Sequence, residues 1–165
     1  MATAIFFASS TGNTEQIASK IASYLDNIEV FDLAGTKVEK INNYDKIILG
    51  GSTWGDGELN DDWEDAWADF CKLDLSNKTI ALFGLGDQES YSDEFCSALG
   101  IIYEQVISKG AKIVGFTSID TYTHDGSKAQ IDDKFVGLVI DEDNQSDLTD
   151  ERIKNWVNDI KEEIL

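Results

Sequence analysis

Short apolar runs alternate with segments of helical period along most of this chain. An apolar run of about four to eight residues is typical of a buried strand, whereas apolar residues that recur every three or four positions are typical of a surface helix. The alternation of the two predicts parallel strands joined by crossover helices. The runs that we interpret as strands cover residues 4–8, 28–31, 46–49, 79–83, 112–116 and 135–140.

Helix signals stand between these runs. Ile17, Ile21 and Leu25 share one helical face after the first run. Later helices are predicted to begin at the capping residues Asn60, Ser92 and Thr149, because each can accept a hydrogen bond from a free backbone N–H and each precedes an apolar stripe of helical period. Gly110 after Lys109 is typical of a helix C-terminus.

A polar stretch of about 18 residues separates the last two apolar runs, which is longer than most connections in compact domains. It is either an insertion or a functional loop. If both runs belong to one strand position, residues 118–134 split that strand, and the fold is α/β with a doubly wound sheet of five strand positions. The 165 residues, 42% of them apolar, are enough for one buried core, so we expect a single domain over 1–165.

Charge and composition exclude several classes of function. Thirty-two acidic residues against thirteen basic ones give a net charge of −19, which opposes binding to nucleic acid or an anionic membrane and favours basic protein partners. No apolar stretch has the length of a membrane span or the pattern of a signal peptide, so we expect a cytoplasmic protein. Cys71 and Cys96 are expected to be reduced thiols, and His124, the only histidine, excludes histidine triads and multi-histidine metal sites.

The string Ser9-Ser10-Thr11-Gly12-Asn13-Thr14 lies between the first run and the first helix. A helix N-terminus presents free N–H groups and a positive dipole end, and the hydroxyl side chains add further donors for an anion. The string lacks the lysine of a Walker A loop and the three glycines of a Rossmann fingerprint. It suits a single terminal monophosphate, such as that of flavin mononucleotide (FMN); the alternative is that it only caps and turns the chain.

Two further loops follow predicted strands, at the edge of the sheet where ligands of doubly wound folds bind. Residues 51–58 contain Trp54, residues 84–91 contain Tyr91, and both loops are rich in glycine. An aromatic ring just past a strand end, flanked by glycines, is placed to stack on a planar ligand. Trp54 and Tyr91 are therefore candidates to sandwich a ring, the alternative being that they pack against the loop edges.

With these motifs the chain resembles the long-chain flavodoxins, from the first strand to the last helix. The motifs are SSTGNT, STWGDGEL, GDQESYSDEF and KFVGLVIDEDNQSDLTDERI. The resemblance implies the strand order 2-1-3-4-5, which flavodoxins exemplify, with the last strand split. The cofactor-binding residues that it implies are Ser9, Ser10, Thr11, Gly12, Asn13, Thr14, Thr53, Trp54, Gly55, Asp56, Gly57, Leu85, Gly86, Asp87, Tyr91 and Asp143.

The resemblance also implies individual roles. Trp54 and Tyr91 would lie on opposite faces of the flavin ring, Asp87 and the neighbouring backbone would meet its pyrimidine edge, and Asp143 would contact the ribityl chain. Ser52 stands where the family often has proline. The peptide between Gly55 and Asp56 would turn over to meet flavin N5–H, which glycine tolerates because it has no Cβ.

The implied function is a low-potential one-electron carrier, not an enzyme, that shuttles non-covalently bound FMN between semiquinone and hydroquinone. A pocket without Lys or Arg, beside many carboxylates, disfavours the anionic reduced flavin and so lowers its potential. We expect a monomer that docks basic surfaces of redox enzymes, such as reductases, near its exposed flavin edge. The acidic run predicted to meet them is Glu58, Asp61, Asp62, Glu64 and Asp65.

Two alternatives stay open at this point. A flavin-dependent NAD(P)H or quinone oxidoreductase of the same fold would need a second binding site, for which we find no dinucleotide motif. A receiver-type signalling domain shares the strand order but needs clustered aspartates at the end of its first strand, where this chain has Ser9 and Ser10.

Overall fold

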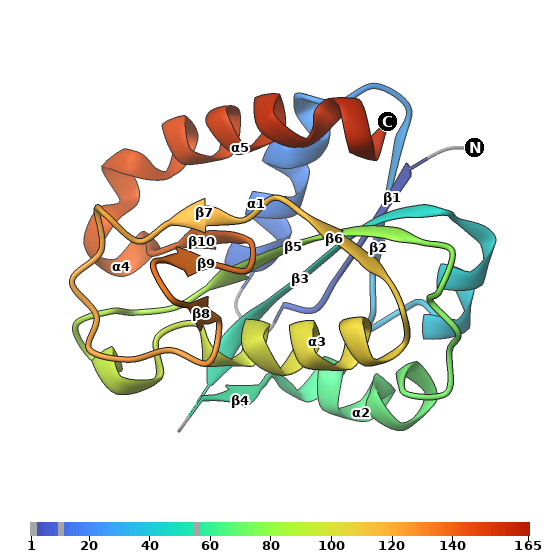
Figure 1. The fold of residues 1–165 in the computed structure, drawn as a ribbon, viewed down its shortest axis with the longest axis horizontal. Coiled ribbons are helices and arrows are strands. Elements are labelled where there is room, and N and C mark those ends of the chain that lie inside the picture. Colours follow the sequence, from blue (N-terminus) through green and yellow to red (C-terminus); the bar gives the residue numbers. More distant parts are fainter. Residues whose placement is uncertain (1–2, 10–11, 55–56) are drawn as a thin grey trace.

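The computed structural model describes residues 3–9, 12–54 and 57–165, with Trp54 described by its backbone alone (Figure 1). Its centre is a parallel sheet in which the order β2-β1-β3-β5 continues to β10, with β6 also paired to β5. The strands of this sheet are β1 (Thr3–Phe7), β2 (Ile28–Asp32), β3 (Lys46–Trp54), β5 (Thr79–Leu85), β6 (Lys112–Val114) and β10 (Leu138–Ile140). The predicted α/β class and strand order are confirmed.

The last strand position is shared by two segments. β6 pairs with Thr79–Ala81 and β10 with Phe83–Leu85, both in parallel, so the two lie end to end along β5. The predicted split strand is therefore confirmed. Between them the chain builds a small antiparallel sheet in the order β7-β9-β8. Its strands are β7 (Thr117–Ser118), β8 (Gln130–Ile131) and β9 (Lys134–Phe135).

The apolar run 135–140 was predicted as one strand, and this is wrong. Phe135 belongs to the small sheet, and only Leu138–Ile140 join the main one. Gly137 lies at the change of direction, where an added Cβ would be only 2.1 Å from the carbonyl oxygen of Leu82. The preceding predicted strand is likewise shortened: it ends at Val114 because Gly115 takes a φ of 89°.

Helices cover both faces of the sheet (Figure 1). α1 (Asn13–Ser23) and α5 (Thr149–Ile164) pack on one face, and α2 (Asp61–Phe70) and α3 (Ser97–Ser108) on the other. Successive strand residues point to opposite faces. In β1, Ala4 and Phe6 join the apolar cluster under α2 and α3, while Ile5 and Phe7 join the cluster under α1 and α5. Among the described residues we find no helix with the length and apolar character needed to cross a bilayer.

The predicted helix start at Asn60 is confirmed, and the other two need correction. Asn60 is the N-cap of α2, but its side chain makes no capping hydrogen bond among the described residues. The helix predicted from Ser92 begins at Ser97, because Ser92–Glu94 form a separate 3-10 turn (η2) and Cys96 takes a left-handed φ of 53°. Thr149 does not cap α5 but is its first residue. α4 (Glu142–Gln145) and the 3-10 turn η3 (Ser146–Leu148) lead directly into it.

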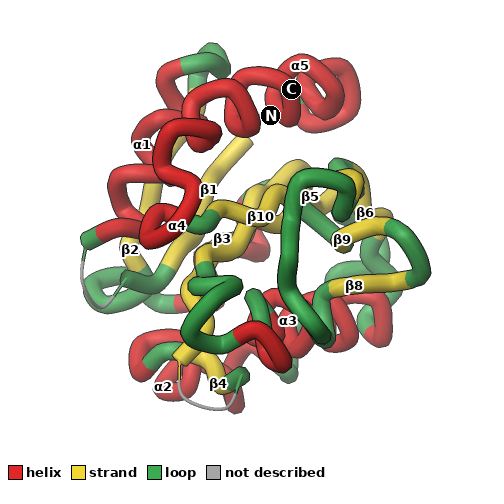
Figure 2. The backbone as a smooth tube through the Cα atoms, turned by 90° about the vertical axis from the view of Figure 1, so that its left-hand side faces the viewer, coloured by secondary structure: helices red, strands yellow, loops and turns green. Residues whose placement is uncertain are grey.

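The carboxyl ends of β1, β3, β5 and β10 meet at one edge of the sheet, because these strands are parallel. Figure 2 views this edge, with α4 and the loop after β5 toward the viewer. Two short elements complete the fold: the 3-10 helix η1 (Val38–Asn43), and β4 (Glu58–Leu59), which pairs antiparallel with the end of β3.

Candidate functional site

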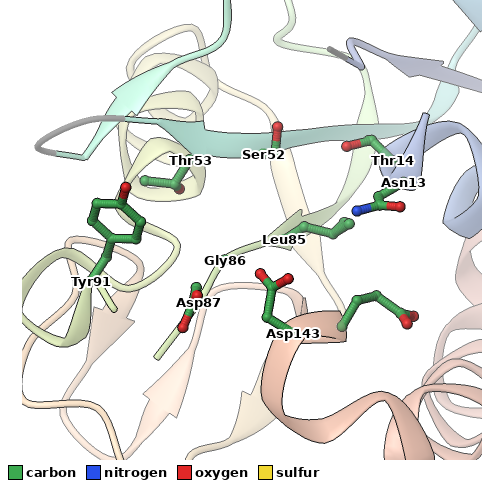
Figure 3. Close-up of a pocket in the computed structure, with 10 residues that line it drawn as sticks. Asn13, Thr14, Ser52, Thr53, Leu85, Gly86, Asp87, Tyr91 and Asp143 are labelled. Atoms are coloured by element: carbon green, nitrogen blue, oxygen red, sulfur yellow. The ribbon is translucent and has the colours of Figure 1, made fainter. Parts of the chain in front are cut away.

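A cleft of about 240 Å³ lies at this carboxyl edge, and the ends of strands together with the segments that follow them build its four walls. Figure 3 shows Asn13 and Thr14 at one end, Tyr91 and Thr53 at the other, and the carboxylates of Asp87 and Asp143 along one side. The residues that line the cleft are Asn13, Thr14, Ser52, Thr53, Leu85, Gly86, Asp87, Tyr91, Glu142 and Asp143. Segments far apart in the sequence thus share one elongated space.

The structure brings half of the sequence-predicted site residues together in this cleft. Those that line it are Asn13, Thr14, Thr53, Leu85, Gly86, Asp87, Tyr91 and Asp143. Ser9, Gly12 and Gly57 are described but do not line it. Ser10, Thr11, Gly55 and Asp56 lie outside the described residues, as does the side chain of Trp54, so its predicted stacking stays a prediction.

The first wall is the turn from β1 into α1. Ser9 Oγ accepts a hydrogen bond of 2.9 Å from the Gly12 N–H, and Gly12, at a φ of 90°, starts the helix by accepting from Gln16 N–H. The first N–H groups of α1 have no acceptor within the helix, and they lie at the positive end of its dipole. With the amide of Asn13 and the hydroxyl of Thr14, this end of the cleft can hold an anion without a cationic side chain.

The second wall is the end of β3. Thr53 Oγ1 accepts a hydrogen bond of 3.0 Å from the Ala98 N–H, which ties the strand end to the first turn of α3. Gly57, a few residues later, is buried at a φ of 92° and does not line the cleft. A Cβ there would lie 2.6 Å from Glu94 Oε2 and 3.0 Å from Ser97 Cβ. Gly57 therefore allows close packing of this loop on the turn before α3.

The third wall is the loop after β5. Asp87 Oδ1 accepts from the backbone N–H groups of Glu89 and Ser90, at 3.1 and 2.9 Å, and from Asn144 Nδ2 at 2.7 Å. Burial acts to raise the pKa of Asp87, but the hydrogen bonds from Ser90 and Asn144 outweigh it and hold that pKa below its usual value. The loop ends at Tyr91, which is 53% exposed and can present its ring to a ligand.

The fourth wall is the first turn of α4. Burial, followed by repulsion from Asp87, Asp141 and Glu142, raises the pKa of Asp143 above its usual value. The sequence reasoning missed Glu142, and it noted Ser52 without assigning it to the site. Both could have been found, because Glu142 closely follows β10 and Ser52 precedes Thr53 at the same edge of the sheet.

The chemistry of this cleft fits a molecule with a planar ring at one end and a phosphate at the other. Its lining holds hydroxyl, amide and carboxylate groups and one aromatic ring, but no Lys, Arg or His among the described residues. A di- or triphosphate normally needs lysine or a metal ion, whereas one terminal phosphate can be held by backbone N–H groups at a helix start. The residues present therefore fit FMN.

Comparison with known proteins agrees with this geometry. A family model described as "Flavodoxin" matches residues 5–156. A flavodoxin of Helicobacter pylori is 48% identical over 157 residues, covering 95% of this chain and 94% of that protein. Flavodoxin 1 of Escherichia coli is 46% identical over 165 residues, covering 98% and 94%. The crystal structure of a Fusobacterium nucleatum flavodoxin bound to flavin mononucleotide superimposes with a TM-score of 0.95 at 34% identity, covering 99% of both chains.

Proposed function

This chain belongs to the flavodoxin family, and we propose on that premise that it is a low-potential one-electron carrier that binds FMN non-covalently. The observation that carries the proposal is the cleft itself, which joins an aromatic rim to a phosphate-type helix start without any cationic side chain among its described lining residues. Flavodoxins are electron-transfer proteins rather than enzymes, and they pass electrons to redox partners.

We assign the residues of the cleft by the part of FMN that each would meet. The phosphate would lie at residues 9–14, where the start of α1 supplies N–H groups. Tyr91 would cover one face of the flavin ring and Trp54 the other, while the backbone of Leu85–Asp87 would face the pyrimidine edge. Asp143 would lie beside the ribityl chain. FMN, when bound, supplies the one-electron chemistry.

The charge of the cleft favours a low reduction potential for bound FMN. The carboxylates of Asp87, Glu142 and Asp143 line it, and no positive side chain among the described lining residues balances them. A negative surrounding makes it harder to add negative charge to a bound group. The chain's own residues thus support a low potential.

Three broader assignments go with this function. We propose that residues 1–165 act as one FMN-binding unit of the long-chain group, supported by the insertion between β6 and β10. We propose the cytoplasm as its compartment, supported by the free thiols of Cys71 and Cys96. We also propose that the carrier is monomeric.

The partner would dock on the acidic run beside the cleft. Glu58, Asp61, Glu64 and Asp65 are exposed, and Asp62 is partly exposed. Burial and then the nearby Asp32, Asp65 and Asp61 raise the pKa of Asp62, so these carboxylates lie close enough to repel one another. Such a surface attracts a basic partner and speeds encounter in a salt-sensitive way.

Calorimetry with added FMN tests the proposal directly. We expect the protein freed of cofactor to bind one FMN per chain, and the loaded protein to take up electrons in two separate one-electron steps during a reductive titration. Without a reductase it should not oxidise NAD(P)H, which separates it from an oxidoreductase of the same fold. A protein that binds no FMN, or that is reduced in a single two-electron step, would refute the carrier function.

A further inference from the structure

Part of the insertion lies against the loop that carries Tyr91. We define the strap as residues 121–128, between β7 and β8. The N–H groups of Asp125 and Gly126 both donate to the Ser92 carbonyl at 2.9 Å, and Phe95 N–H donates to the Gly126 carbonyl at 3.1 Å. Backbone hydrogen bonds therefore join the strap to the segment that follows Tyr91.

Gln88 is the residue of that loop most fully enclosed by this arrangement. Its neighbours Asp87 and Glu89 are partly or fully exposed, but Gln88 is only 2% exposed. Its Nε2 donates to Asp141 Oδ2 at 2.7 Å, and its Oε1 accepts from Thr123 N–H at 2.6 Å and from Thr123 Oγ1 at 3.2 Å. Both ends of the side-chain amide are thus bonded, one to the end of β10 and one to the strap.

The carboxylate of Asp141, directly after β10, is the hydrogen-bond acceptor for Gln88. Asp141 is fully buried, and none of the ion pairs among the described residues includes it. It is satisfied by amide donors instead: Gln88 N and Nε2, and Asn144 N and Nδ2. Asn144 Nδ2 also reaches Asp87 Oδ1 at 2.7 Å. A continuous set of hydrogen bonds therefore runs from the cleft wall at Asp87 through Asn144, Asp141 and Gln88 to Thr123.

We propose that Gln88 is a positioning residue of the cofactor site. It holds the loop 86–91 by joining Asp141 on one side to Thr123 of the strap on the other. That loop supplies both the backbone at Gly86 and Asp87 and the ring of Tyr91 to the cleft, so Gln88 orients the groups that would face the flavin ring without touching it. The proposal rests on the proposed function, and it gives the insertion a role in the site.

The test is the variant Gln88→Met, which keeps the length of the side chain and removes its hydrogen bonds. Calorimetry measures the Kd of the cofactor-free protein for FMN and for riboflavin, which lacks the phosphate. We expect both Kd values to rise about tenfold, as the loss of buried hydrogen bonds suggests. The ratio of the two should stay constant, because the phosphate end is unaffected. The visible circular dichroism of bound FMN should also change, since it reports the surroundings of the ring.

Gln105→Met is the matched control, since Gln105 lies in α3 near its C-terminal end, away from the cleft. It should leave both Kd values unchanged. Gln88→Met binding within twofold of the unmodified protein for both ligands would overturn the positioning role. An unmodified protein that fails to bind FMN would instead refute the proposed function.

A second pair of variants tests the positioning role of Gln88 if the Met variant does not fold. Gln88→Glu would set two carboxylates against each other at the present 2.7 Å contact with Asp141, and their repulsion should weaken FMN binding. Adding Asp141→Asn restores a contact between an amide and a carboxylate and should recover the affinity. Equal FMN affinity of the single and double variants would contradict the proposal.

Discussion

At the scale of single residues, the charge on Asp143 should affect the reduction potential of bound FMN, because Asp143 lines the cleft. Its raised pKa shows that the ionised form is disfavoured by burial and by Asp87, Asp141 and Glu142. Asp143→Asn removes one negative charge while keeping the size of the side chain. The potential of the second one-electron step should rise by on the order of 10–40 mV, the Coulomb energy of one partly screened charge.

Spectroelectrochemical titration measures this shift. Asp147→Asn is the control, since Asp147 is an exposed acid in η3 that does not line the cleft. It should move the potential by a smaller amount. Equal shifts in the two variants would mean that overall charge, and not the position of Asp143, sets the potential.

The carboxylate of Asp87 predicts a response to acid. Its pKa is lower in the folded protein than in the unfolded chain, because hydrogen bonds from Ser90 and Asn144 favour the ionised form over the opposing effect of burial. It therefore adds stability above its unfolded pKa of about 4, and this contribution is lost as the pH falls through the folded pKa. In Asp87→Asn, whose amide oxygen can still accept these bonds, the free energy of unfolding should fall less steeply with acid. Urea titrations between about pH 6 and pH 3 compare the two slopes, and identical slopes would exclude Asp87 as a source.

At the scale of elements, the strap packs closely on α3. A Cβ on Gly100 would lie 2.3 Å from the carbonyl carbon and oxygen of Lys128. Gly100→Ala ought to stabilise a helix by about 0.5–1 kcal/mol, but here the backbone of Lys128 must move. We expect a net loss of about 1–3 kcal/mol in the free energy of unfolding, as for other overpacked sites.

Urea unfolding measures this loss. Gly35→Ala is the control, because a Cβ there meets no atom within 4 Å, and it should be close to neutral. If Gly100→Ala is as stable as the unmodified protein, the strap is not held against α3 in solution.

The elements also show which features of the fold can be predicted from the sequence and which cannot. The strands themselves were predictable, since each apolar run is short, separate and bounded by polar residues, whereas the strand order and the split of the last strand came from the resemblance to long-chain flavodoxins. The start of α3 was not, because Ser92 uses its carbonyl and hydroxyl to bind the strap at Asp125 and Gly126, far along the chain. Gln88 gave no local signal for the same reason: its partners Asp141 and Thr123 are distant in sequence and meet it only in the folded chain.

At the scale of the whole molecule, we expect only some of the acids behind the net charge of −19 to guide a partner. The acidic run begins at Glu58, in the short strand β4 that pairs with the end of β3, and Thr53 of β3 lines the cleft. Changing Glu58, Asp61, Glu64 and Asp65 to Lys should slow electron transfer from a reductase by about tenfold or more at low salt, because steering by opposite charge is lost. The difference should shrink at high salt, where surface charges are screened.

Stopped-flow mixing with a reductase measures these rates. A matched variant reverses four other exposed acids, Asp147, Glu151, Asp159 and Glu162, of which one lies in η3 and three lie on α5, on the face of the sheet opposite α2. It has the same net charge and should be slowed much less. Equal slowing by both variants would show that total charge, and not the acidic run, guides the partner.

The interrupted strand has a consequence for self-association. A second copy, or a misfolded chain, adds to a sheet through a long row of free backbone groups on an edge strand. At this edge β6 and β10 offer three residues each, separated by the insertion, and at the other edge β2 carries Glu29 and Asp32. Neither edge gives a long uncharged template, so the fold is protected at both sides against growth into fibrils.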